Sequence, residues 1–160
     1  MILVDTTGLW GLIFEDSKYH KFIINELSGK IIYVIDAQIL ELFRVIYRAF
    51  SGHGKRFNDG LNKLIEVSEF LENKLYEMKG VRIVYLKTDY GDYIEAIRII
   101  VENPEIFARE GPRGTLWPEI IDAIIAVIWR RNRATLYTKD EALISFGEKE
   151  KLSYVLIVQD

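Results

Sequence analysis

The chain of 160 residues has no cysteine and only two histidines, His20 and His53. The lack of cysteine excludes disulfide bonds, thiolate nucleophiles and cysteine-ligated zinc or iron–sulfur sites, and it gives no sign of an oxidising compartment. Two histidines argue against a zinc site built from histidine. No apolar run reaches the roughly 18 residues of a membrane span, and Met1 to Asp5 lacks the basic segment of a signal peptide. We therefore expect a cytoplasmic protein that does not contact a membrane.

The chain also lacks a strong excess of either charge, since 21 lysines and arginines face 24 acids and the formal net charge is −3. Such a chain has no global attraction to nucleic acid, so any contact with RNA or DNA must come from local basic patches. A hydrophobic content of 49% in 160 residues is enough to bury a core. We expect one globular domain over residues 1–160.

Short apolar runs alternate with longer stretches of helical period, which is typical of an α/β domain with a mostly parallel sheet. The predicted strands are Ile2 to Val4, Ile31 to Ile35, Arg82 to Leu86, Ala134 to Thr138 and Tyr154 to Val158. The predicted helices are Ser17 to Leu27, Ala37 to Ala49, Asn58 to Met78, Asp92 to Val101, Pro118 to Arg131 and a short one from Glu141 to Phe146.

Four carboxylates interrupt or close these apolar runs. Asp5 and Asp140 follow predicted strands, and ligand sites of parallel sheets lie at the carboxyl ends of strands. Glu41 and Asp122 lie within apolar helical runs. Several acids forced together repel and desolvate one another, and hard divalent cations relieve that cost best. The pattern therefore favours a metal-dependent enzyme.

Each acid also has a structural interpretation. Asp5 and Asp140 are suited to cap the helices that follow them, with Thr6 or Thr7 as rival caps for the first. Glu41 has Arg44 one turn away for an ordinary salt bridge, worth about 0.2 to 0.5 kcal/mol. Asp122 has the weakest such alternative, because we expect it in mid-helix among isoleucines, with alanine rather than a base four residues on. Pro118 is expected at the start of that helix.

Taken in order, four motifs resemble those of the PIN-domain nucleases. They are Ile2-Leu-Val-Asp-Thr6, Ile39-Leu-Glu-Leu42, Ile121-Asp-Ala-Ile-Ile-Ala126 and Tyr137-Thr-Lys-Asp-Glu-Ala142, with the predicted last strand after them. The resemblance implies a three-layer α/β/α fold with a mostly parallel sheet of about five strands. Two features depart from the small toxin nucleases of that family: the stretch Gly80 to Arg113 is longer, and Glu119 adds a fifth acid.

The resemblance also implies a Mg²⁺ or Mn²⁺ site made by the four acids Asp5, Glu41, Asp122 and Asp140. Thr138 matches the family's hydroxyl residue before the last acid and is expected to orient a ligand or water. The implied activity is endoribonucleolytic cleavage by metal-activated water, leaving a 5′-phosphate and a 3′-hydroxyl. The implied partners are RNA, an antitoxin protein and a second copy of the chain, as in toxin–antitoxin pairs.

Basic residues near these motifs are candidates for RNA contact. They are Arg44, Arg48, Lys55 and Arg56, and at the end of the Asp122 helix Arg130, Arg131 and Arg133. Solvated surface charge is the competing interpretation for each.

Two other functions compete with the nuclease. Val4-Asp-Thr-Thr7 is similar to the start of aspartyl-phosphate phosphatases, but these require a second Asp where Thr7 stands. A PIN-like binding or scaffold module whose acids no longer hold metal is the non-enzymatic alternative.

Overall fold

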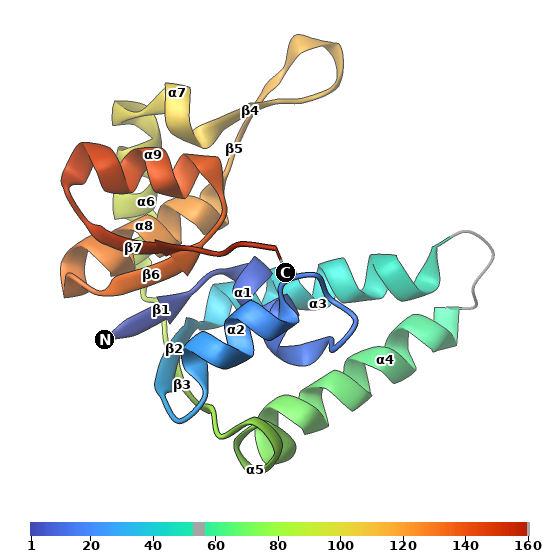
Figure 1. The fold of residues 1–160 in the computed structure, drawn as a ribbon. Coiled ribbons are helices and arrows are strands. Elements are labelled where there is room, and N and C mark those ends of the chain that lie inside the picture. The colour runs from blue at the N-terminus through green and yellow to red at the C-terminus, as the bar shows by residue number, and fades with distance from the viewer. Residues whose placement is uncertain (53–56, 160) are drawn as a thin grey trace.

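The computed structural model describes residues 1–52 and 57–159. Its centre is a five-stranded sheet in the order β3-β2-β1-β6-β7, and every neighbouring pair is parallel (Figure 1). The strands are β1 (Ile2–Val4), β2 (Ile31–Ile35), β3 (Arg82–Leu86), β6 (Thr135–Thr138) and β7 (Ser153–Leu156). The predicted α/β class and all five predicted strands are confirmed, with ends shifted by one or two residues.

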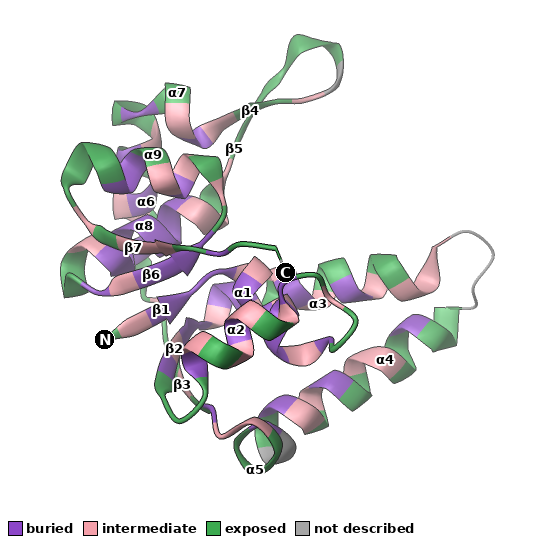
Figure 2. Ribbon diagram, viewed as in Figure 1, coloured by how far each residue is buried: buried purple, intermediate pink, exposed green. Residues whose placement is uncertain are grey.

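Helices cover both faces of this sheet. Packed on one side are α1 (Thr6–Ile13), α2 (His20–Leu27), α3 (Asp36–Ser51), α4 (Phe57–Glu69) and α5 (Leu75–Lys79). The other side carries α6 (Tyr90–Glu102), α7 (Pro104–Phe107), α8 (Ile120–Asn132) and α9 (Glu141–Glu150). A separate apolar core fills each interface, and these buried segments are purple in Figure 2. The result is the expected α/β/α arrangement.

Two helices on the first side differ from the prediction. The periodic stretch Asn58 to Met78 is not one helix, because a π-turn over Phe70–Lys74 separates α4 from α5. Helix α1 was given no range in the prediction, although Asp5 was considered as the cap of a helix at this place. A Cβ at Gly8 would lie 2.1 Å from Val4 Cγ1, and one at Gly11 would lie 3.1 Å from Ile23 Cγ1. The glycines therefore let α1 pack closely against β1 and α2.

An unpredicted hairpin rises from the other side of the molecule and is visible at the top of Figure 1. It consists of β4 (Ala108–Glu110) and β5 (Leu116–Pro118), which pair antiparallel around a turn at Arg113 and Gly114. Both turn residues have positive φ, 66° and 72°, in the left-handed region that favours glycine. Pro118 thus ends a strand, and the prediction that it begins the next helix is wrong, because α8 begins at Ile120.

Within residues 1–52 and 57–159, no helix has both the length and the apolar character needed to cross a bilayer.

Candidate functional site

Asp5 lies at the carboxyl end of the central strand β1, where it is only 4% exposed. Its Oδ1 accepts a hydrogen bond from Gly8 N at 2.7 Å and so caps α1, while Oδ2 accepts one from Thr138 Oγ1 at 2.6 Å. The capping interpretation of Asp5 is therefore correct. It does not remove Asp5 from the site, because the same carboxylate is tied to the end of β6.

Thr138 joins two of the predicted acids. It is fully buried, donates its hydroxyl proton to Asp5 and accepts a hydrogen bond from Asp140 N at 3.0 Å. A hydroxyl has one proton to donate, and here that proton is used by Asp5. Thr138 was expected to orient a ligand or water, but its contacts show that it orients acids.

Asp140 caps α9, as its structural interpretation predicted. Its Oδ1 accepts hydrogen bonds from Ala142 N at 2.9 Å and Leu143 N at 3.1 Å. A carboxylate at a helix N-terminus is stabilised by the orphan amides and the helix dipole. One oxygen of Asp140 is fixed in this way, next to the end of β6.

Glu41 extends from the second turn of α3 toward the start of α1. Its Oε2 accepts a hydrogen bond from Thr6 Oγ1 at 2.5 Å. The expected salt bridge to Arg44 is not among the ion pairs of the described residues, and Arg44 is exposed. Glu41 therefore faces the strand ends and not its own helix surface.

Asp122 lies in the first turn of α8, not in mid-helix as expected, because the helix begins two residues later than predicted. It is partly buried, and no hydrogen bond or ion pair joins its side chain to the rest of the described chain. The pKa of Asp122 is raised to about 8, mainly by burial and then by the charges of Asp140, Glu41, Glu119 and Asp5, in that order of size. The charges of four acids, Asp140, Glu41, Glu119 and Asp5, thus all act on the Asp122 carboxyl.

The pKa of Asp5 is raised to about 6, mainly by burial and to a smaller extent by the charge of Asp140. Its hydrogen bonds from Thr138, Gly8 and the backbone of Lys139 oppose that rise. Neighbouring carboxyls with raised pKa values are unusual among residues that only support the fold, and they are common at catalytic and ligand-binding sites.

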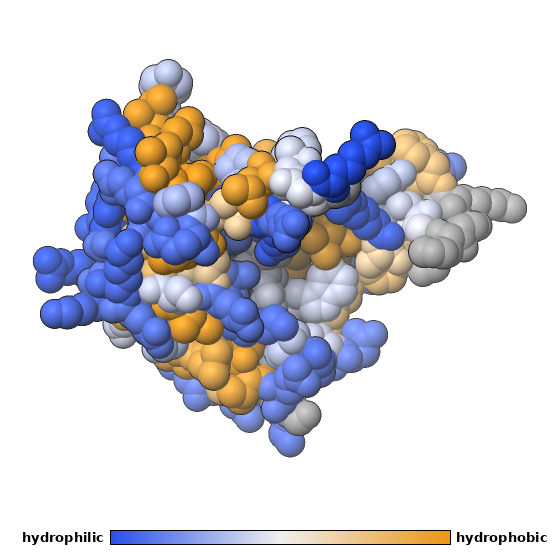
Figure 3. Space-filling view, turned by 90° about the horizontal axis from the view of Figure 1, so that it is seen from above, coloured by the Kyte–Doolittle hydropathy of each residue, from blue (hydrophilic) through white to orange (hydrophobic). Residues whose placement is uncertain are grey.

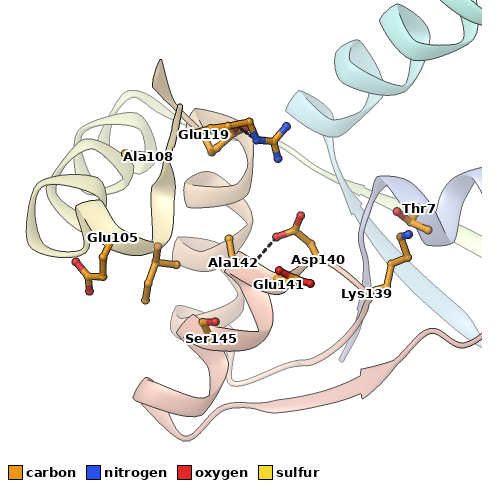
Figure 4. A pocket seen from close by; sticks show the side chains of 11 residues that line it. Thr7, Glu105, Ala108, Glu119, Lys139, Asp140, Glu141, Ala142 and Ser145 are labelled. Atoms are coloured by element: carbon orange, nitrogen blue, oxygen red, sulfur yellow. Dashed lines mark hydrogen bonds and ion pairs between the residues drawn. The ribbon is translucent and has the colours of Figure 1, made fainter. Parts of the chain in front are cut away.

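A pocket of about 550 Å³ opens beside Asp140 and runs under the base of the hairpin (Figure 4). Its lining combines α7, the hairpin base, α9 and the start of α1: Thr7, Glu105, Ile106, Ala108, Arg109, Glu119, Lys139, Asp140, Glu141, Ala142 and Ser145. Asp5, Glu41 and Asp122 do not line it. The pocket therefore touches the site only through Asp140. Figure 3 shows a hollow near the middle of the face seen from above.

No protein-family model and no curated protein matches the chain. Solved structures do match over nearly its whole length. FitAB bound to the IR36 DNA fragment has 16% identity and a TM-score of 0.59, covering 98% of this chain and 94% of that one. VapC20 of Mycobacterium tuberculosis, described as a sarcin–ricin loop cleaving toxin, has 16% identity and a TM-score of 0.60, with coverage of 92% and 95%. PAE2754 from Pyrobaculum aerophilum has 15% identity and a TM-score of 0.57, with coverage of 98% and 88%. The chain has the PIN-domain fold.

The acids of this PIN domain suit a hard divalent cation in their chemistry, since all are carboxylates. None of Asp5, Glu41, Asp122 and Asp140 is in an ion pair within the described chain. In the same residues, however, no three Asp, Glu or His side chains are close enough to form a ligand group. Hydrogen bonds to Thr6, Thr138 and the α9 amides occupy oxygens of Glu41, Asp5 and Asp140.

The basic residues predicted to contact RNA have different surroundings in the PIN domain. Arg44 and Arg48 are exposed on α3, while Lys55 and Arg56 lie outside the described residues. Arg130 and Arg131 occupy the last turn of α8, at the opposite end from Asp122, and pair with acids of α6. Arg133 follows them as the C-cap. RNA contact by these three arginines stays a prediction, and α8 places them at the end opposite the carboxyl edge.

Three polar residues at the site were not predicted. Thr6 holds Glu41, Thr7 lines the pocket, and Lys139 lines it between Thr138 and Asp140. Lys139 Nζ donates to Tyr19 Oη at 2.7 Å. Tyr19 is only 7% exposed. Thr6, Thr7 and Lys139 lie within two residues of Asp5 or Asp140 in the sequence. That proximity was the only feature of the sequence that indicated a role at the site.

Proposed function

We propose that this PIN domain is an endoribonuclease that hydrolyses RNA phosphodiester bonds with a divalent cation, Mg²⁺ or Mn²⁺, and that it is the toxin of a toxin–antitoxin pair. The observation that carries the proposal is the convergence of Asp5, Glu41, Asp122 and Asp140 from four distant segments on the carboxyl edge of the sheet. The whole-length likeness to VapC20, a sarcin–ricin loop cleaving toxin, supports it.

In the proposed mechanism, Asp5, Glu41 and Asp122 would hold the cation. When bound, a divalent cation lowers the pKa of water and offsets the charge of the phosphate. Asp140 orients the attacking water or holds a second cation, with one oxygen anchored on α9. Thr138 and Thr6 keep Asp5 and Glu41 turned toward the edge through their hydroxyl protons. Attack of water on phosphorus with departure of the 3′-oxygen leaves a 5′-phosphate and a 3′-hydroxyl.

The test is an end-group assay on single-stranded RNA incubated with the native chain and Mn²⁺ or Mg²⁺. We expect fragments with 5′-phosphate and 3′-hydroxyl ends, and no fragments in EDTA. Fragments that carry 2′,3′-cyclic phosphate, or cleavage that persists in EDTA, would contradict the proposal, because those results indicate attack by the RNA's own 2′-hydroxyl.

One observation favours a second candidate, a silent PIN-like scaffold. The carboxylates do not form a ligand group in the described chain, and a pKa of about 8 leaves Asp122 mostly protonated near neutral pH. Calorimetric titration with Mn²⁺ separates the two candidates. Saturable binding that is lost in Asp122→Asn supports the nuclease, whereas no binding supports the scaffold.

The partners in this proposal are RNA, an antitoxin protein and a second copy of the chain. FitAB bound to DNA is a structural neighbour, which supports a partner protein of that kind for this chain as well. Exposed apolar side chains for such contacts lie along α4 at Phe57, Leu61 and Ile65. Light scattering of the purified chain measures whether it is a dimer, and a monomeric mass at micromolar concentration contradicts that part.

A further inference from the structure

The β4–β5 hairpin carries an aromatic side chain in a defined position. Trp117 is 60% exposed, although its ring lies against the backbone of Gly111 on the opposite strand. A Cβ at Gly111 would be 2.2 Å from Trp117 Cδ1 and 2.5 Å from Nε1. The missing side chain therefore makes room for the ring, and one face of the ring is covered by backbone. The other face is available to a ligand.

Cations flank the ring. Arg109 is the cross-strand partner of Trp117, so both side chains project from the same face of the hairpin. The Arg109 side chain is 68% exposed and its Nε lies 2.7 Å from Glu119 Oε1, which ties the hairpin to the residue ahead of α8. Arg113 is exposed at the turn. The hairpin is thus basic on the side where its aromatic ring lies.

The pocket extends from the base of the hairpin to Asp140. Ala108, Arg109 and Glu119 of the hairpin base line it together with Lys139 and Asp140 (Figure 4). Acids dominate its floor, so a polyanion that enters it needs cations at the rim. Arg109 and Lys139 are the two cations of the lining.

We propose that the hairpin positions a single-stranded nucleic acid for the acidic edge, with Trp117 stacked on an unpaired base and Arg109 and Arg113 on the flanking phosphates. This inference rests on the proposed nuclease function and names the part of the chain that holds its substrate. Aromatic rings bind bases of any sequence through their π faces, and arginines add backbone attraction.

The surroundings of the ring favour a nucleic acid over a protein. The neighbouring exposed apolar residue, Leu116, pairs with Glu110 and so projects from the other face of the hairpin. Trp117 therefore shares its face of the hairpin with Arg109, while Leu116 lies on the opposite face. The centre of a protein–protein interface is usually a continuous apolar patch.

The experiment measures binding of a short labelled oligoribonucleotide in EDTA, where the proposed chemistry is stopped. Variants are Trp117→Ala, Trp117→Phe and the matched control Tyr76→Ala, an aromatic residue 59% exposed on α5 at the far end of the molecule. We expect Trp117→Ala to weaken binding by about tenfold, Trp117→Phe by about twofold, and the control not at all. Duplex RNA, whose bases are already stacked, should bind all four proteins alike.

Equal affinity of Trp117→Ala and the control for single-stranded RNA overturns the proposal. An equal loss of affinity for duplex RNA also overturns it. A change in the mass of the protein in solution without a binding defect overturns it as well, because that change would assign Trp117 to a protein interface. Cleavage with Mn²⁺ is measured on the same proteins. Cleavage without any Trp117 effect refutes the hairpin alone, and a Trp117 binding defect without cleavage supports the hairpin while refuting the nuclease.

Discussion

The two ends of helix α8 place acids in opposite electrostatic settings. At its carboxyl end, Arg131 pairs with Asp92 of α6 at 2.5 Å, and Arg130 pairs with Glu95 at 2.7 Å. Asp92 is only 3% exposed, so it is as buried as Asp5. At the amino end, Asp122 has only other acids as charged neighbours among the groups that shift its pKa.

The comparison shows which buried acid is structural. A buried carboxylate is tolerated when an arginine neutralises it, and both arginines also interact favourably with the carboxyl end of the α8 dipole. The acids at the amino end have no such compensation and raise each other's pKa values instead. That arrangement is costly for folding alone, which is why we assign a function to this end of α8 and not to the other.

The largest expected effect comes from exchanging the two buried acids for their amides. Asp122→Asn should lower RNA cleavage by about 1000-fold, because it removes a proposed cation ligand but leaves the packing of α8 intact. Asp92→Asn should leave cleavage within about twofold of native and lower the free energy of unfolding by about 1 to 3 kcal/mol, since Arg131 loses its partner. Cleavage rates and denaturant unfolding measure the two effects. Equal cleavage rates of the two variants would show that the two ends of α8 do not differ in function.

The next effect is a dependence of stability on pH. Asp122 and Asp5 have pKa values of about 8 and about 6 in the folded chain, against 3.8 when unperturbed. Between pH 4 and pH 8 the folded chain therefore binds more protons, so its stability is highest at the acid end and falls as pH rises. These two shifts correspond to a loss of about 5 kcal/mol from pH 5 to pH 8 in EDTA.

Thermal unfolding in EDTA at several pH values measures this slope. Asp122→Asn should flatten it, Asp92→Asn should keep it, and Mn²⁺ should restore stability at pH 8. A native chain with the same stability at pH 5 and pH 8 would show that the acids at the amino end of α8 are not under strain.

A smaller effect is expected from the hydroxyl that links two acids. Thr138→Val keeps the volume but removes the donor to Asp5 and the acceptor for Asp140 N. Cleavage should fall by about tenfold, and the pKa of Asp5 should rise further, because the Thr138 hydrogen bond lowers it. The matched control is Thr135→Val at the other end of β6, whose long 3.4 Å contact is with Ser153. Similar losses in both variants would reduce Thr138 to a packing residue.

Much of this arrangement was predictable because its causes are local. The strands are short apolar runs, and Asp5 and Asp140 follow them, so their placement on one edge follows from parallel pairing. The close packing of helix α1 was not predictable, because its two glycines are explained only by contact with β1 and α2. The pairing of Arg131 with Asp92 likewise depends on how α6 packs against α8.

The candidate site follows the same division. The sequence identified the acids, but Thr6 as the partner of Glu41 depends on the packing of α1 against α3. The hairpin was not predicted because its two exposed strands are only three residues each and have no apolar alternation. How closely the carboxylates approach one another depends on side-chain rotamers, which a sequence pattern does not predict.

The smallest expected effect concerns the basic residues, and it extends the comparison from acids to phosphate contacts. Arg44 and Arg48 are exposed on α3, the helix of Glu41, whereas Arg98 of α6 pairs with Glu95 at 3.4 Å near the other end of α8. Arg48→Ala should weaken RNA binding by about threefold and reduce the slope of log affinity against log salt by about 0.7, the value for one phosphate contact on a single strand. Arg98→Ala should change neither, because Arg98 lies away from the acidic edge. If both variants give the same slope as the native chain, the phosphates follow a path that avoids α3, and the hairpin with Lys139 remains as the basic approach to the acids.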